Sequence, residues 1–79
     1  MTAAERRVLQ FIDCEIRMHH GYPSTQRIMQ CLREPGIRDA VHGLVIAGLI
    51  RRLPKVRRGA NRYELTAAGV NLLQGVSAA

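Results

Sequence analysis

Hydrophobic residues recur at helical spacing over roughly the first twenty positions, as Val8, Phe11/Ile12 and Ile16. The preceding segment Thr2-Ala-Ala-Glu5 is a capping box. In this motif the Thr hydroxyl accepts a backbone amide hydrogen and the Glu side chain reaches back to the capping residue. Gly21 suits the left-handed residue that often follows a helix. We therefore expect a first helix from about Ala3 to His20, followed by Gly21 in the left-handed conformation.

Two shorter helical segments follow. Gly21-Tyr22-Pro23-Ser24-Thr25 predicts a turn, because a proline disfavours helix at the residue before it. Either Ser24 or Thr25 can cap a second helix, whose apolar positions are Ile28, Met29 and Leu32. Arg33-Glu34-Pro35-Gly36 then breaks it. A third helix is predicted to carry Ile37, Val41 and Leu44 and to end at Gly48.

The periodicity changes after Gly48. Residues 49–53 predict a strand, 54–61 a loop and 62–65 a returning strand. Thr66 can cap a short last helix with Val70, Leu72 and Leu73 on its apolar side. The expected fold is α+β and mainly α: three helices, a β-hairpin and a short C-terminal helix. The length of 79 residues is consistent with a single domain over 1–79.

The positive charge is concentrated in one segment. The chain has twelve Lys+Arg against six Asp+Glu, for a net charge of +6, and Lys55 is its one lysine. Residues 51–62 hold six cationic residues and no acid, which equals the whole excess. Arginine presents a planar fork suited to phosphate and to guanine edges. A basic excess by itself is compatible with nucleic acid, an anionic membrane or an acidic protein.

Several classes of protein do not fit the sequence. The longest apolar run, Gly43 to Ile50, is too short for a bilayer, which needs about 20 apolar residues, and no signal peptide begins the chain. Two cysteines, Cys14 and Cys31, are too few for a disulfide framework and are expected as buried thiols. We therefore expect a cytoplasmic protein without a membrane partner.

Catalytic and metal-binding patterns are also missing from the sequence. It contains no Gly-rich phosphate loop and no deducible Ser/His/Asp constellation. His19, His20 and His42 lack the spacing of zinc ligands, and the first two more simply offset the dipole at a helix C-terminus. The expectation is a protein that is not an enzyme and that has no cofactor and no metal.

Residues 2–65 resemble the winged helix-turn-helix domains of bacterial repressors, most closely the N-terminal DNA-binding domain of LexA repressors. The matching residues are Thr2, Gly21-Tyr22-Pro23-Ser24-Thr25, Ile28, Leu32, Val41-x-x-Leu44-x-x-x-Gly48-Leu49-Ile50 and Arg57-Arg58-Gly59. The ending Tyr63-Glu64-Leu65-Thr66-x-x-Gly69 is similar to other winged-helix regulators, in which a helix follows the wing.

This resemblance implies a small regulator of double-stranded DNA, such as a repressor of phage or mobile-element type. Its third helix would enter the major groove, and its hairpin, the wing, would lie on the backbone or in the minor groove. Two departures matter. The turn at residues 33–36 is about two residues shorter than usual in the family, which reduces the N-terminal reach of the third helix. The self-cleavage of LexA repressors is not implied, because no peptidase domain follows.

Candidate DNA contacts lie on two of the helices. On the third helix, Arg38 can donate to guanine O6 and N7, Asp39 can accept from cytosine N4, and His42 shares their face. The alternative is a solvated face on which Glu34 pairs with Arg38. The start of the second helix holds three more candidates, Thr25, Gln26 and Arg27. They could hydrogen-bond a DNA phosphate or could simply cap the helix, and the sequence favours neither interpretation.

The wing supplies the remaining candidates: Lys55, Arg57 and Arg58 at the tip, Arg51, Arg52 and Arg62 on the strands, and Asn61 at the end of the loop. Side chains alternate along a strand, so Arg51 and Arg52 should face opposite sides and the six cations cannot all touch one partner. A hairpin that is charged only for solubility is the alternative, although such surfaces usually mix both signs.

Val45 and Ile46 make the third helix apolar on more than one side. Either the last helix covers this surface or a second copy of the chain does, which would give a homodimer on a symmetric DNA site. A second functional class also stays open: a protein-binding winged-helix module, for example a phage-type inhibitor docked on a nucleic-acid-handling complex. RNA binding is disfavoured, because the chain has just three aromatic residues for base stacking.

Overall fold

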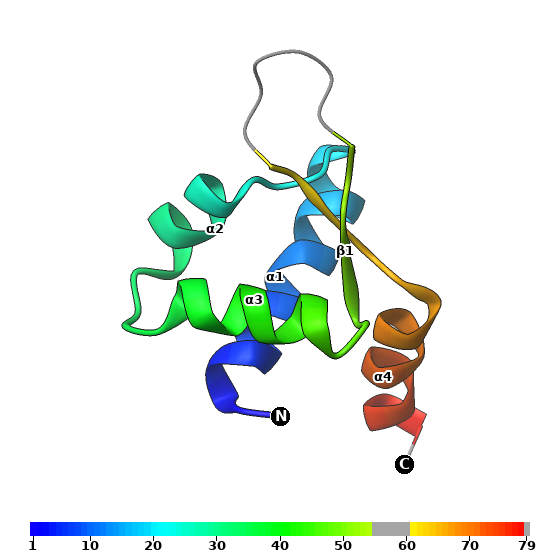
Figure 1. The fold of residues 1–79 in the computed structure, drawn as a ribbon. Helices are drawn as coiled ribbons and strands as arrows, with labels where there is room; N and C mark the ends of the chain where they lie inside the picture. The colour runs from blue at the N-terminus through cyan, green and yellow to red at the C-terminus, as the bar shows by residue number, and fades with distance from the viewer. Residues whose placement is uncertain (55–60, 79) are drawn as a thin grey trace.

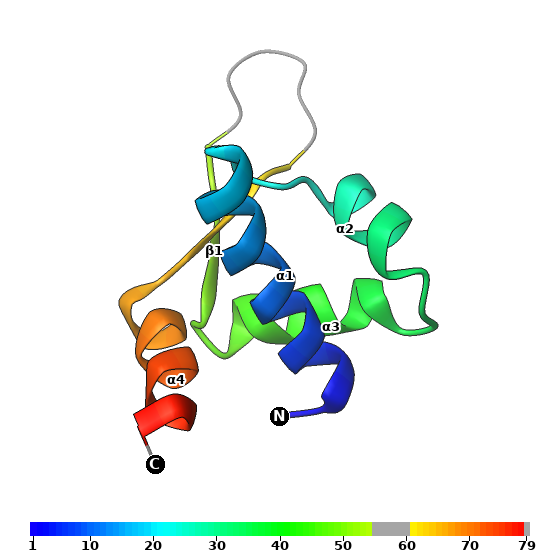
Figure 2. The same ribbon diagram turned by 180° about the vertical axis from the view of Figure 1, so that it is seen from behind.

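The computed structural model describes residues 1–54 and 61–78. The predicted tip residues Lys55, Arg57 and Arg58 therefore lie outside the described residues. The elements are α1 (Ala3–His19), α2 (Thr25–Leu32), α3 (Ile37–Ile46), β1 (Ile50–Arg52), β2 (Tyr63–Leu65) and α4 (Ala67–Ala78). Figure 1 shows α3 crossing in front of α1, and Figure 2 shows the same crossing from behind. In both views α4 lies on the opposite side of the hairpin from α2.

Helix α1 begins as predicted and ends one residue earlier. The Glu5 amide donates to Thr2 Oγ1 (3.1 Å), and the Thr2 amide donates to Glu5 Oε1 (2.8 Å), so the capping box is present. At the other end the prediction for Gly21 is wrong, because His20 takes the left-handed conformation with φ 55°. Gly21 then leads into Pro23, whose carbonyl accepts from the Tyr63 amide (3.1 Å). This long-range bond attaches the segment after α1 to the hairpin.

The next two helices follow the predicted order. Ser24 is the cap of α2, since its Oγ accepts from the Arg27 amide (3.1 Å). Arg33, with φ 41°, ends α2, and α3 ends at Ile46, two residues before the predicted Gly48. Gly48 has φ 77°, a left-handed conformation that favours glycine. It redirects the chain from α3 into the first strand.

The two strands form an antiparallel hairpin that is attached to the helices at its base. The register pairs Ile50 with Leu65, Arg51 with Glu64 and Arg52 with Tyr63. An isolated bridge between Ser24 and Arg62 lies beside the bond from Tyr63 to Pro23. The wing is therefore held against the segment that connects α1 and α2.

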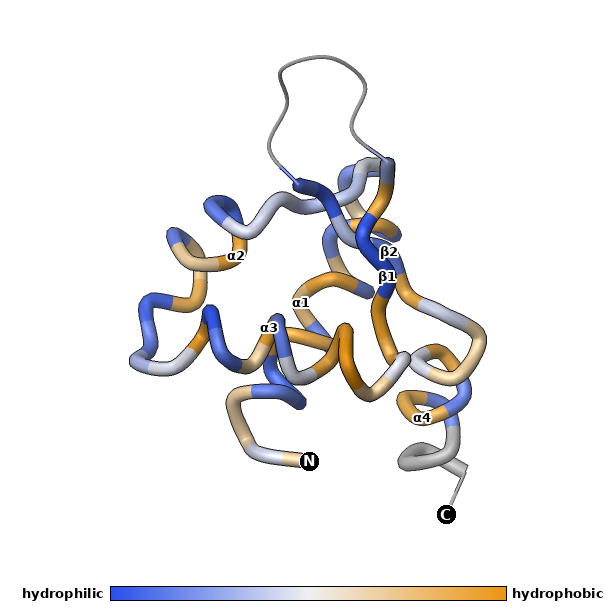
Figure 3. The backbone as a smooth tube through the Cα atoms, in the orientation of Figure 1, coloured by the Kyte–Doolittle hydropathy of each residue, from blue (hydrophilic) through white to orange (hydrophobic). Residues whose placement is uncertain are grey.

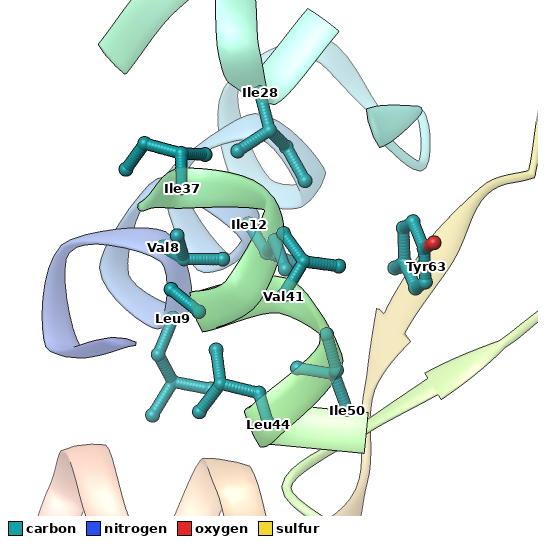
Figure 4. Packing of buried hydrophobic residues seen from close by; sticks show 10 residues of the cluster. Val8, Leu9, Ile12, Ile28, Ile37, Val41, Leu44, Ile50 and Tyr63 are labelled. Carbon is teal, nitrogen blue, oxygen red and sulfur yellow. The ribbon is translucent and has the colours of Figure 1, made fainter. Parts of the chain in front are cut away.

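A single apolar cluster joins α1, α2, α3 and the hairpin. Its fully buried members are Val8, Leu9, Ile12, Ile28 and Leu44, together with Ile50 at 2% exposure. Figure 4 shows these side chains meeting between α1 and α3, with the Tyr63 ring at the edge of the cluster. Figure 3 shows hydrophobic stretches along both α1 and α3. Burial on this scale is the main stabilising term in a small domain.

The closing helix packs closely on Leu49, in the connection between α3 and β1. A Cβ placed on Gly69 would lie 2.2 Å from the Leu49 carbonyl oxygen, so only glycine permits this approach. Thr66 caps α4 as predicted, with its Oγ1 accepting from the Gly69 amide (3.2 Å). Leu72 and Leu73 pack against the core, while Ile46 stays 73% exposed.

The cysteine prediction is wrong, because Cys14 and Cys31 are both exposed. Cys14 lies two residues after Ile12, roughly 200° around the helix from a buried position. On α2, Ile28 and Leu32 take the inward positions and leave Cys31 outside. In the described part of the chain, no helix is both long enough and apolar enough to cross a membrane.

Candidate nucleic-acid interface

Two adjacent hollows form a concave surface between α2, α3 and the wing. The α2–α3 hollow, of about 600 Å³, is lined by Thr25, Gln26, Met29, Gln30, Arg33, Arg38 and Asn61. The α3–wing hollow, of about 300 Å³, is lined by Thr25, Arg38, Val41, His42, Val45, Arg52 and Tyr63. Thr25 and Arg38 line both hollows, so the two are contiguous. None of these lining residues is acidic.

The burial pattern of α3 turns its polar residues toward these hollows. Ile37, Ala40, Val41 and Leu44 are buried in the core. Arg38 and His42 fall between those positions and are exposed, one helical turn apart. The two side chains therefore project from the same outward stripe of the helix.

Strand pairing sends the two neighbouring arginines of β1 to different sides. Arg52 is opposite Tyr63, and residues opposite one another in an antiparallel pair share a face of the sheet. Arg52 thus lines the α3–wing hollow together with the Tyr63 ring. Arg51 is opposite Glu64 and forms an ion pair with it. The predicted separation of Arg51 and Arg52 is confirmed.

The start of α2 is tied to the wing through a side-chain hydrogen bond. Thr25 Oγ1 donates to the Tyr63 hydroxyl oxygen at 2.9 Å, and Tyr63 is buried. Gln26 is exposed and lines the α2–α3 hollow. Arg27, by contrast, is held by Glu15, with Nε and Nη2 lying 3.2 and 3.1 Å from Oε1. A phosphate contact by Arg27 would therefore compete with this ion pair.

Ion pairs divide the described arginines into two groups. Four have carboxylate partners: Arg7 with Glu34, Arg17 with Asp13, Arg27 with Glu15 and Arg51 with Glu64. The alternative pairing of Glu34 with Arg38 is wrong, because the left-handed Arg33 ends α2 and Glu34 reaches α1 instead. Within residues 1–54 and 61–78, the arginines without a carboxylate partner are Arg6, Arg33, Arg38, Arg52 and Arg62.

The other predicted residues are spread around this surface. Asn61 lines the α2–α3 hollow, and Arg62 is exposed at the bridge to Ser24. Asp39 is exposed in the first turn of α3 and lines a third hollow, of about 420 Å³, beside the α2–α3 turn. It does not line the other two. The structure thus gathers six predicted residues around the two hollows: Thr25, Gln26, Arg38, His42, Arg52 and Asn61.

Sequence reasoning missed six residues that line these hollows: Met29, Gln30, Arg33, Val41, Val45 and Tyr63. Residues 26, 29, 30 and 33 follow helical spacing, so the outer stripe of α2 could have been recognised from Gln26 onward. Arg33 was considered only as part of the helix break. The described residues contain no group of three or more His, Cys, Asp or Glu side chains placed to hold a metal ion.

Comparison with known proteins supports the fold. No protein-family model and no curated protein sequence matches the chain. The crystal structure of the S. aureus MepR–DNA complex is similar, with a TM-score of 0.80, 16% sequence identity and coverage of 99% of this chain. The match covers 55% of the MepR chain, so this chain spans about half of its length. Together with four helices and an antiparallel hairpin in the described residues, this likeness shows the predicted winged helix-turn-helix fold.

Proposed function

We propose that this protein is a transcriptional regulator that binds double-stranded DNA through the surface formed by α2, α3 and the wing. The observation that carries the proposal is the acid-free concave surface of the two hollows, on which Arg33, Arg38 and Arg52 have no carboxylate partner. Arginines placed in this way suit the phosphates and base edges of a duplex. The MepR structure, a similar fold in complex with DNA, supports this choice of ligand.

In this arrangement α3 enters the major groove and the wing meets the flanking backbone or minor groove. Asp39, exposed in the first turn of α3, accepts a hydrogen bond from cytosine N4. Arg38 and His42, which lie before and after it on the same helix, also contact the DNA. At the start of α2, Gln26 is better placed for a phosphate than Arg27, which is held by Glu15, or Thr25, whose hydroxyl donates to Tyr63. Because α3 meets the bases and α2 meets a phosphate, α3 is the main source of the preference for particular DNA sequences.

The wing contributes affinity that is insensitive to sequence. Lys55, Arg57, Arg58 and the exposed Arg62 neutralise phosphates beside the groove, whereas Arg51 is held by Glu64. If about four cations meet phosphates, log K falls against log salt concentration with a slope of roughly −3.6. Arg57→Ala with Arg58→Ala should weaken binding to all duplexes alike.

Fluorescence anisotropy tests the proposal. Labelled duplexes of random and of genomic sequence are titrated with the protein over a series of salt concentrations. Binding with a steep negative salt slope, together with tighter binding to a subset of genomic fragments, is the expected result. A slope near zero, or no binding at low salt, overturns the proposal.

A second candidate function, a protein-binding winged-helix module, is favoured by one observation. Ile46 at the end of α3 is 73% exposed, and the packing of Leu72 and Leu73 from α4 does not bury it. The same surface is where a second copy of the chain would form the proposed homodimer. Retained partner capture by a variant that has lost its wing cations and its DNA affinity would support the protein-binding module.

A further inference from the structure

The α3–wing hollow brings positive charge together from two separate elements. Arg38 comes from α3 and Arg52 from β1, and both line the hollow with His42 and Thr25. No acidic residue lines it. Arg38 also lines the third hollow, where Asp39 and Glu34 are found, whereas Glu64 of β2 binds Arg51 on the other face of the hairpin.

This arrangement differs from the rest of the described surface, where most acidic side chains are matched to an arginine or to a helix cap. Four carboxylates pair with arginines, and Glu5 closes the capping box with Thr2. Two guanidinium groups that face one hollow without a counter-charge repel each other. An anion placed between them would remove that repulsion and accept hydrogen bonds from both.

Resting on the proposed function, we propose that the α3–wing hollow is a phosphate-binding site in which Arg38 and Arg52 hold one phosphate group between them. His42 completes its polar wall. This assignment gives Arg38 a role different from the guanine contact that the sequence predicts.

The shape of a duplex favours a phosphate over a base at this position. When α3 lies in the major groove and the wing lies outside it, the ridge between them is the sugar-phosphate backbone. A hollow between α3 and the wing therefore receives that ridge, while base edges lie at the floor of the groove and meet the protruding side of the helix. The site thus fixes the position of α3 relative to the sugar-phosphate backbone of the DNA.

Arg51 provides a matched control for Arg52. The two residues are neighbours on β1, both are exposed, and replacing either one by glutamine removes one positive charge. Arg51 is paired with Glu64 on the opposite face, whereas Arg52 lines the hollow. A difference between Arg51→Gln and Arg52→Gln therefore reports position and not net charge. Thermal unfolding monitored by circular dichroism verifies that each variant is folded.

The first test uses inorganic phosphate as the probe, with no DNA. Heteronuclear NMR of the whole chain is recorded during a phosphate titration, including the arginine side-chain Nε–Hε signals. We expect saturable shifts at Arg38, Arg52 and His42 that disappear in Arg52→Gln and persist in Arg51→Gln. Equal and non-saturating signal shifts at all exposed arginines would show non-specific attraction of phosphate and would overturn the proposed site.

The second test uses a duplex selected by the protein from a random pool, in which single phosphates are replaced one at a time by neutral methylphosphonates. We expect one position at which neutralisation weakens wild-type binding by roughly ten- to a hundredfold, as for a charge-assisted hydrogen-bond pair. The same substitution should have little further effect on Arg38→Gln or Arg52→Gln. Arg51→Gln should respond as wild type does.

The outcomes separate this inference from the proposed function. Saturable phosphate binding at the hollow in a protein that ignores DNA supports the site, with a free phosphate as its ligand, and refutes the DNA proposal. DNA binding in which Arg52→Gln and Arg51→Gln lose equal affinity overturns the site and leaves the DNA proposal intact. If Arg38→Gln relaxes preference at one base pair and keeps the full methylphosphonate effect, Arg38 reads a base and the site is overturned.

Discussion

Thr25 Oγ1 donates a 2.9 Å hydrogen bond to the hydroxyl oxygen of Tyr63, and so joins the first residue of α2 to the first residue of β2. The Tyr63 amide also donates to the Pro23 carbonyl. These two bonds attach the base of the wing to the helix-turn-helix. The angle between wing and α3, and with it the shape of the α3–wing hollow, therefore depends on contacts outside the hairpin.

Tyr63→Phe tests the energetic contribution of this bond. The ring still packs in the core, but Thr25 loses its acceptor, and we expect unfolding to require about 1 kcal/mol less free energy. Urea unfolding of Tyr63→Phe, Thr25→Val and the double variant forms a thermodynamic cycle. Tyr22→Phe on the exposed Tyr22 is the control. Strictly additive losses in the cycle would show that the two hydroxyl groups do not interact.

Gly69→Ala tests the close approach of α4 to Leu49, in the connection between α3 and β1. The new methyl group would meet the Leu49 carbonyl oxygen, a backbone atom that cannot move aside alone. We expect a loss of stability of about 1–3 kcal/mol, measured as a lower melting temperature. Gly21→Ala is the control, because its Cβ would find ordinary contacts and its φ is not positive. An unchanged melting temperature for Gly69→Ala would contradict the packing.

Glu5 gives a prediction about acid stability. The backbone amide and the side chain of Thr2 hydrogen-bond the ionised carboxylate, which holds the pKa of Glu5 below its ordinary value. The unfolded chain therefore takes up this proton at a higher pH than the folded one. The resulting stabilisation is present at neutral pH and is lost as the pH falls through the folded-state pKa. Glu5→Gln should reduce stability at neutral pH and flatten the acid limb of the stability curve. Asp39→Asn is the control, because Asp39 is exposed and lies outside the capping box. Its stability should fall more steeply with decreasing pH than that of Glu5→Gln.

Arg27→Gln should mainly affect stability. Glu15 is only 9% exposed, and Arg27 is its ion-pair partner. Leaving that carboxylate unpaired should cost about 1 kcal/mol, a figure reduced because half of the Arg27 side chain is exposed. Chemical denaturation measures this loss. Arg17→Gln, which breaks an exposed pair with Asp13, should cost less than about 0.5 kcal/mol. Equal losses in the two variants would be inconsistent with a structural role for Glu15.

Ile46→Asp tests the proposed homodimer. If a second copy covers the end of α3, an aspartate at this position should shift sedimentation-equilibrium profiles toward the monomer mass, because its burial in an apolar interface is unfavourable. Met18→Asp is the control, since Met18 is similarly exposed on α1. The same self-association in Ile46→Asp and wild type would exclude this surface as the dimer contact.

Much of the local structure could be predicted because its causes are local. The Thr2–Glu5 capping box, the Ser24 cap and the apolar stripes of α1 and α3 depend on residues within one or two helical turns of each other. The change to alternating periodicity placed the strands to within one or two residues. Alternation also sends Arg51 and Arg52 to opposite faces, as the register shows.

The errors share a physical cause. Gly21 is expected to be the left-handed residue after α1, but His20 takes that conformation, and the segment that follows is attached to the hairpin by a bond between Pro23 and Tyr63, forty residues apart. Cys14 and Cys31 were expected inside, but the side chains that face the core depend on how the helices rotate against their neighbours. Glu34, in the turn between α2 and α3, pairs with Arg7 of α1 and not with the neighbouring Arg38 of α3.

The sequence by itself determined where the helices begin, which faces are apolar and where the cationic segment lies, because these features arise from neighbouring residues. The tertiary structure decided which arginines are neutralised by a carboxylate and which converge without one. Arg38 and Arg52 line one hollow because a helix and a strand pack on the same core. Such convergence depends on distances between segments far apart in the chain, and no local pattern encodes those distances.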